Sequence, residues 1–194
     1  MQIGGKLETG RASMKSLRGV LAVVFIVHCL TVSAVRGADP VGVPMDKAIE
    51  VIKNFNFVVL TLGILSDGVP DGLTDQLSKM QTAPPRSMRI YLTQNKKLWD
   101  IYNDFTFLTN EKAVNAILIY PSAGMGDAVL IDKICQMSKR KKIPIIAMQD
   151  GWLEKGAAVV IEEASSPRIK VNEQVCQVLN FPIAERPIYQ LVRQ

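Results

Sequence analysis

The sequence predicts a single three-layer α/β domain whose sheet is mostly parallel and carries an antiparallel hairpin at one edge. Strand-like runs are separated by amphipathic segments and small-residue turns, and these runs occupy residues 58–65, 88–93, 116–120 and 143–148. Two further runs, 157–162 and 168–171, are separated by a turn that contains Ser165-Ser166-Pro167, which is typical of a hairpin.

A helix is expected on either side of the first strand. Residues 45–54 place apolar side chains at helical spacing and predict a helix ahead of the sheet. The near-continuous apolar run at 58–65 suits a strand that is covered on both faces. Pro70 is expected in the first turn of the next helix, in which Lys79 comes late, as the helix dipole favours. The alternating run at 88–93 predicts the second strand.

The segment after the second strand contains aromatic residues at helical spacing. Residues 95–103 predict a helix with Leu98, Trp99 and Tyr102 directed inward. Residues 105–114 are interpreted as a connector that leads to a separate short helix. These two helices are expected to return the chain to the third strand.

The third and fourth strands are joined by the clearest crossover helix of the sequence, at residues 126–140. Because strands alternate with helices, the first four strands are expected to be parallel with right-handed crossovers. A last short helix is centred on residues 175–179, and the conformation of residues 188–192 is left open.

Residues 1–37 are expected to be a leader with a secretory signal, and residues 38–194 to form the mature domain. Basic residues precede an apolar run at 20–27, and small residues follow it, which is the pattern of a signal peptide. The run is shorter than a membrane span needs, and an uncleaved anchor is the alternative. Met1 and Met14 are both open as the start. We therefore expect export to the periplasm.

Removal of the leader changes the charge and the chemistry of the chain. Five of the 23 basic residues and one of the 18 acidic residues lie within residues 1–37, so residues 38–194 carry a net charge of +1. A basic nucleic-acid-binding role therefore loses its main support. His28 is the only histidine, so the mature chain has no imidazole for general-base catalysis or metal binding. We expect no catalytic residue, cofactor or metal site.

Two cysteines remain after the leader, Cys135 and Cys176. In an oxidising compartment a pair of cysteines is typical of one disulfide, and two buried free thiols are the alternative because apolar residues flank both positions. Two cysteines alone do not supply the ligands of a zinc site.

The turn at residues 122–127 joins a strand to a helix and is the main candidate for ligand binding. Backbone N–H groups and the helix dipole at such a turn can hold an anion or a ligand carboxylate. An ordinary strand-to-helix turn is the alternative, and Gly-Met-Gly without a third glycine is a weak dinucleotide signal. Ser122 lacks a histidine base and is therefore not expected to act as a nucleophile.

Carboxylates and one tryptophan in the turns complete the candidate site. Asp67, Asp127, Asp132 and Asp150 include groups suited to a cation or a polar ligand, and helix capping is the alternative. Trp152 is a recognition residue if exposed and a core residue if buried. The predicted ligand-binding set is Ser66, Asp67, Ser122, Gly124, Gly126, Asp127, Asp150 and Trp152.

Four consecutive basic residues, 139–142, end the crossover helix. The helix dipole favours positive charge at this end, which indicates a solvated face. A phosphate or another anionic partner is the alternative.

Five apolar and hairpin motifs occur in an order that resembles YfiR-like periplasmic proteins over residues 45–192. The motifs lie at residues 62–65, 116–120, 143–147, 155–158 and 167–172. The resemblance implies a non-enzymatic protein that restrains a membrane-bound diguanylate cyclase from the periplasmic side, often as a homodimer.

The middle of the chain also resembles one lobe of ABC-type solute-binding proteins, through Asp127–Ile131 and Ile143–Ala147. That resemblance implies capture of a small-molecule ligand for a transporter. The leading hypothesis is therefore an exported regulatory or binding protein whose partner is a membrane-bound signalling protein, and a single-lobe component of a transport system is the alternative.

Overall fold

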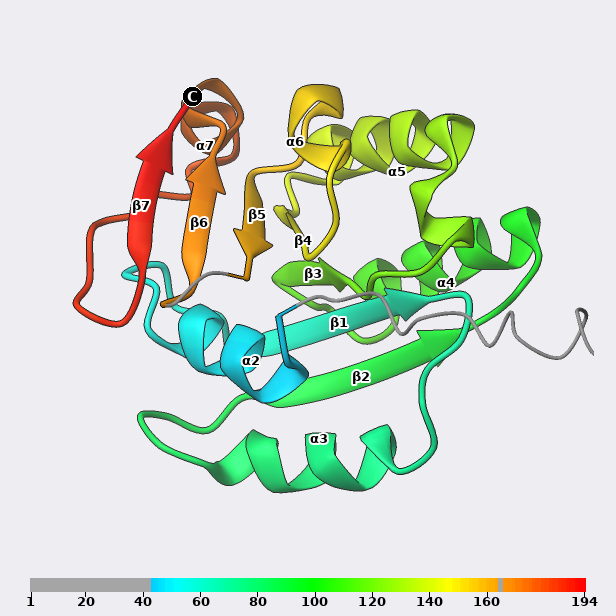
Figure 1. The fold of residues 1–194 in the computed structure, drawn as a ribbon. Helices are drawn as coiled ribbons and strands as arrows, with labels where there is room; N and C mark the ends of the chain where they lie inside the picture. The colour runs from blue at the N-terminus through cyan, green and yellow to red at the C-terminus, as the bar shows by residue number, and fades with distance from the viewer. Residues whose placement is uncertain (1–42, 164–165) are drawn as a thin grey trace, which may run out of the picture. The chain divides into compact units, whose positions relative to one another are not determined.

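Seven strands form one sheet in the computed structural model, which describes residues 43–163 and 166–194 (Figure 1). The strands are β1 (Thr61–Ser66), β2 (Arg89–Gln94), β3 (Ala116–Ile119), β4 (Ile145–Ala147), β5 (Val159–Glu162), β6 (Arg168–Val171) and β7 (Gln190–Arg193). The helices are α2 (Met45–Lys53), α3 (Leu73–Thr82), α4 (Leu98–Asn110), α5 (Ala128–Lys141), α6 (Trp152–Lys155) and α7 (Glu173–Leu179), with a 3-10 turn, η2 (Gly124–Gly126).

The strand order is β2-β1-β3-β4-β5-β6-β7. The first five strands are parallel to their neighbours, β5 and β6 are antiparallel, and β7 is parallel to β6. The mostly parallel α/β sheet with an antiparallel hairpin is thus confirmed. The hairpin is not the edge of the sheet, because β7 adds one more strand beyond β6.

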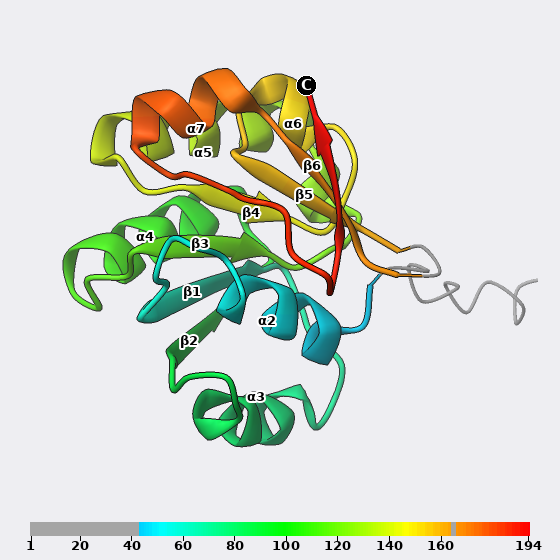
Figure 2. The same ribbon diagram turned by 90° about the vertical axis from the view of Figure 1, so that its left-hand side faces the viewer.

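Helices cover both faces of the sheet and produce three layers (Figure 2). Buried apolar side chains of α2, α3 and α7 pack in one cluster, and those of α4, α5 and α6 pack in another. Adjacent strand residues alternate between the clusters, so Leu118 belongs to the first and Ile117 and Ile119 to the second. Each central strand is therefore buried on both faces, as its continuous apolar sequence predicts.

Helix α4 differs most from the expectation. It runs unbroken from Leu98 to Asn110, whereas the sequence was interpreted as two helices with a connector. Its buried stripe is Ile101, Phe105 and Leu108. The prediction that Leu98 and Trp99 pack inward is wrong, and Tyr102 is only half-buried. The three buried residues follow helical spacing with the register shifted by one or two positions, which directs Trp99 to solvent.

Smaller differences concern the ends of helices and two short elements. Helix α3 begins at Leu73 after Gly72, which has φ 81°, so Pro70 precedes the helix rather than lying in its first turn. The short helix α6 and strand β7 were not predicted, since four residues carry too little periodicity to identify them.

No helix within residues 43–163 and 166–194 is long and apolar enough to cross a membrane. The expected leader at residues 1–37, the two candidate starts and Ser165 of the hairpin turn lie outside the described residues.

Candidate functional site

The connections of the sheet change direction between β1 and β3. From β1 the chain passes through α3 to β2 on one side, and from β3 it passes through α5 to β4 on the other side. The two helices cover opposite faces of the sheet, so the loops that follow β1 and β3 diverge. In open α/β sheets, ligands bind at the carboxyl ends of strands at such a switch point.

The loops after β1 and β3 meet directly. The amide of Gly124 donates a hydrogen bond to Oδ2 of Asp67 over 3.0 Å. A Cβ atom at position 124 would lie 2.3 Å from the same oxygen, so only glycine allows this approach. The two predicted site residues are thus brought together, and Asp67 binds the protein's own backbone.

Ser66 does not face this contact. Its side chain is fully buried, and its hydroxyl accepts a hydrogen bond from the amide of Gly68 over 2.9 Å and donates one to the Gly68 carbonyl. Ser66 therefore stabilises the turn that follows β1.

Gln149, which follows β4, holds the other side of the β3 loop. Its Oε1 accepts a hydrogen bond from the amide of Ser122 over 3.1 Å. The Ser122 hydroxyl accepts one from the amide of Met125 over 3.3 Å. A Cβ atom at Gly126 would lie 2.6 Å from Nε2 of Gln149. Gln149 is not among the predicted site residues, although its place directly after a buried strand is a signal for this edge of the sheet.

Asp127 caps helix α5. Its Oδ1 accepts hydrogen bonds from the amides of Val129 and Leu130, each over 2.9 Å. Both bonds use one carboxylate oxygen, and the residue is exposed. The helix-capping alternative therefore accounts for Oδ1 of Asp127, whereas Oδ2 takes no part in these two hydrogen bonds.

Trp152 is a core residue and is removed from the ligand-facing set. Its side chain is fully buried, and Nε1 donates a hydrogen bond to the Met125 carbonyl over 3.1 Å. The single turn of α6 places the indole in the cluster with α4 and α5, and its hydrogen bond to Met125 holds η2 there. Asp150 is exposed, and its negative charge acts on Lys170, whose pKa is raised mainly by Glu162.

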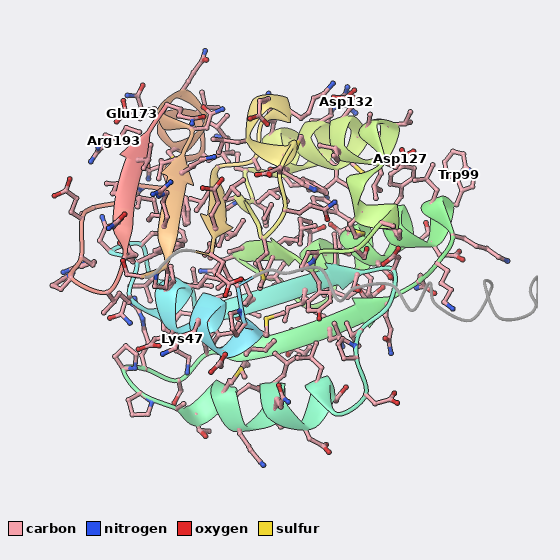
Figure 3. All side chains as sticks on the ribbon, viewed as in Figure 1. Lys47, Trp99, Asp127, Asp132, Glu173 and Arg193 are labelled. Atoms are coloured by element: carbon pink, nitrogen blue, oxygen red, sulfur yellow. The ribbon has the colours of Figure 1, made fainter. Side chains whose placement is uncertain are left out.

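An aromatic pair, the exposed Trp99 and the half-buried Tyr102, lies beside Asp127. The Trp99 side chain is 74% exposed, and its ring lies 5.6 Å from that of Tyr102 in an edge-to-face arrangement. Partial burial raises the pKa of the Tyr102 phenol, and the Asp127 charge raises it further. Figure 3 shows Trp99 and Asp127 on the same side of the molecule. Trp99, Tyr102 and Asp127, together with Val129 of α5, form what we call the aromatic edge. Val129 is 65% exposed.

The two cysteines are free and buried on opposite faces of the sheet. Cys135 belongs to the cluster with α4 and α6, and Cys176 belongs to the cluster with α2 and α3. Burial raises the pKa of both thiols to about 12. The structure therefore has the alternative arrangement of two buried thiols, because the sheet separates the two side chains.

The remaining charged candidates belong to helix α5. Asp132 forms an ion pair with Lys155 over 3.1 Å rather than joining Asp67. Lys139, Arg140 and Lys141 form the exposed last turn of α5, where the helix dipole favours positive charge. Within the described ranges, no group of three or more His, Cys, Asp or Glu residues could hold a metal ion.

No protein-family model matches the chain, and no curated protein sequence matches it. Solved structures do match. An ABC domain in complex with L-Trp from Streptococcus pneumonia has a TM-score of 0.57 and 16% identity, covering 76% of this chain and 60% of that one. The ligand-free, open structure of a substrate-binding protein with adhesive properties from Clostridium difficile has a TM-score of 0.56 and 16% identity, covering 78% and 60%.

A third structure, a conserved domain protein from Vibrio cholerae, has a TM-score of 0.59 and 13% identity, covering 73% of this chain and 57% of that one. The chain thus spans about three fifths of the length of these proteins, with between 57% and 60% covered. At these identities the likeness shows a shared α/β fold.

Proposed function

We propose that this chain is a non-catalytic binding domain that takes a small-molecule solute at the aromatic edge. The observation that carries the proposal is the exposed Trp99 with the half-buried Tyr102 beside Asp127, at the carboxyl ends of the strands where the sheet changes direction. An exposed tryptophan at a switch point contributes little buried surface to the core, and its ring suits stacking against a ligand.

The chemistry of the aromatic edge favours a solute with a positively charged group. Ring faces attract cations, and the Asp127 carboxylate adds a negative charge beside them. An amino acid carries such an ammonium group, and L-Trp is bound in the Streptococcus pneumonia structure. Amino acids are therefore the first class of ligand to test.

Two features support the absence of catalysis in this proposal. The only histidine of the chain is His28, outside the mature domain that we propose. The polar groups of the two loops are also engaged with each other, as the Asp67–Gly124 and Ser122–Gln149 hydrogen bonds illustrate. These groups form a rigid frame for the aromatic edge rather than a set of free nucleophiles and bases.

Tryptophan fluorescence tests the proposal because the two tryptophans have opposite environments. Trp99 is exposed, whereas Trp152 is fully buried. Titration with a panel of amino acids is expected to change the emission saturably in the wild-type protein. The change should disappear in Trp99→Phe, which keeps Trp152 as an internal reference.

Asp127→Asn is the second variant of this experiment, and Asp132→Asn is its control. Asparagine is also a good N-cap, so the first variant keeps helix α5 while it removes the charge beside the rings. We expect affinity to fall about tenfold in Asp127→Asn, as for loss of one charge-assisted contact, and to stay unchanged in Asp132→Asn. Equal affinities in the two variants, or no saturable response to any solute, would count against the proposal.

A regulatory partner-binding role is the second candidate, as the YfiR-like resemblance implies. The observation that favours it is the apolar exposure of the aromatic edge, because exposed apolar side chains also mark protein-binding surfaces. A photo-crosslinking amino acid at position 99, used in native membranes, separates the roles. A membrane-bound cyclase as the crosslinked product supports regulation, whereas a transporter permease supports solute capture.

Export to the periplasm is part of both candidate roles. N-terminal sequencing of the protein purified from its native cells tests it. A first residue near position 38 is expected, and retention of residues 1–37 would contradict cleavage of the leader.

A further inference from the structure

A cavity of about 450 Å³ lies at the opposite end of β1 from the aromatic edge. It is lined by residues 53–56, which follow the end of α2, and by Pro85 and Arg86, which precede β2. Arg186, from the segment before β7, completes the wall. The volume is within the range of sites that hold small molecules.

Two of the three basic residues in this wall are fixed by helix ends. Lys53 is buried, and its Nζ donates hydrogen bonds to the carbonyls of Met80 and Ala83 at the end of α3. Arg86 donates from Nε to the Lys53 carbonyl and from Nη2 to the Phe55 carbonyl, each over 2.6 Å. Each helix end is thus capped by a cation from the neighbouring segment, which leaves Nη1 of Arg86 outside these bonds.

The segment that carries Arg186 is tied to the same wall. The Ala184 amide donates a hydrogen bond to Oδ1 of Asn56 over 2.9 Å, and the Tyr189 hydroxyl donates to the Ala184 carbonyl over 2.6 Å. These bonds hold the exposed Arg186 at the cavity. The Asn56 amide nitrogen, a donor, is on the same side chain as the oxygen that Ala184 occupies.

The positive charge of the cavity is not neutralised by acidic side chains. No carboxylate is among the lining residues. Within the part of the chain that the structure describes, the ion pairs involve other cations: Lys47, Lys155, Lys170 and Arg193. The ends of α2 and α3 contribute roughly half a negative charge each, which offsets about one of the three positive charges.

We propose that this cavity binds a small oxyanion, a phosphate or carboxylate group of a solute, between Arg186, Arg86 and the Asn56 amide. The planar guanidinium of Arg186 is suited to hold two oxygens of such a group at once. Lys53 forms the charged floor. This site is separate from the aromatic edge and takes ligand groups of the opposite charge.

Isothermal titration with inorganic phosphate, at constant ionic strength set with chloride, tests the proposal on the full domain. Succinate replaces phosphate in a parallel titration, which shows whether the site prefers a phosphate or a carboxylate group. Saturable binding of either anion is expected. Absence of saturable binding of both would overturn the proposal.

Arg186→Gln is the informative variant, and Arg140→Gln is the matched control. Both residues are exposed and both substitutions remove one positive charge, but Arg140 lies on the last turn of α5. We expect Arg186→Gln to weaken anion binding about tenfold, as for loss of one bidentate pair, and Arg140→Gln to leave it unchanged. An equal loss in both variants would show charge screening instead of a site. Unaltered Trp99 fluorescence during the titration separates this result from the function proposed above.

Discussion

The polar groups at the two ends of β1 are paired in different ways. At the carboxyl end, loop donors and acceptors satisfy each other, as in the Asp67–Gly124 contact, and the Trp99 ring remains exposed. At the amino end, cations satisfy backbone carbonyls and surplus positive charge faces a cavity. The difference between the two ends is that the turn residues after β1 are engaged with the protein's own backbone, whereas the residues proposed here for binding lie beside those turns.

The largest effect is expected for the two tryptophans at the carboxyl end. Trp152→Ala removes a fully buried indole and its bond to η2, and should lower the free energy of unfolding by about 3–5 kcal/mol. Trp99→Ala removes an exposed ring and should change it by about 0.5 kcal/mol or less. Urea denaturation measures both, and similar losses would remove the distinction between frame and surface.

At the amino end, the corresponding pair is Arg86 and Arg186. Arg86→Gln removes the two charge-assisted bonds to the end of α2 and should lower the free energy of unfolding by about 2–3 kcal/mol. Arg186→Gln should leave thermal stability nearly unchanged, because the residue is exposed. A large loss of stability in Arg186→Gln would mean that Arg186 stabilises the fold, which would contradict its assignment to ligand binding.

The close contact of the two loops is tested by glycine substitutions. Gly124→Ala places a Cβ atom 2.3 Å from Oδ2 of Asp67 and should lower the free energy of unfolding by about 1–2 kcal/mol through loss of that hydrogen bond. Gly68→Ala is the control, since a Cβ atom there meets nothing within 4 Å. Equal effects in chemical denaturation would indicate that the Asp67–Gly124 contact contributes little.

The two buried thiols, one on each face of the sheet, should make the stability of the fold depend on pH. Each folded thiol has a pKa of about 12 against an ordinary 9.0, so between these values the unfolded chain releases protons that the folded chain keeps. Stability that is present below pH 9 is therefore lost as the pH rises toward 12, by about 1 kcal/mol per thiol at pH 10.

Cys135→Val and Cys176→Val should each flatten this pH dependence when unfolding is measured in urea at several pH values. Tyrosines titrate in the same range and remain in both variants, so the difference from wild type isolates one thiol. An unchanged slope in one variant would mean that the thiol on that face is accessible in the folded state.

The long apolar runs allowed the strands to be predicted well, whereas the aromatic segment of α4 did not allow its buried face to be predicted. Strands β1 and β3 lie within the runs at 58–65 and 116–120, apart from Ser66, because strands that are buried on both faces must be apolar throughout. Helix α4 was misread because Trp99 suggests burial by type, whereas the packing of Phe105 against the sheet decides which face turns inward.

The candidate site was predictable as far as local turn chemistry reaches. Asp127 as a cap follows from its position before a helix, since capping depends on neighbouring backbone, whereas the contact of Gly124 with Asp67 joins residues that are 57 positions apart. Gln149 and the wall of Lys53, Arg86 and Arg186 were not predictable, because they join segments that only the completed fold brings together. No local pattern in the sequence marks such a set.

The position of β1 in the sheet has a consequence for how the chain is made. Both of its partners come later in the sequence: β2 begins at Arg89 and β3 ends at Ile119. An emerging chain therefore carries an apolar strand with no neighbour until β2 ends at Gln94, about halfway along the 194 residues, and without its second neighbour until β3 ends at Ile119. In contrast, β6 can pair with β5 as soon as it is made, since Glu162 and Arg168 are in register. The sheet therefore cannot assemble around β1 until β2 and β3 have been synthesised, and β1 is the segment most in need of protection during synthesis.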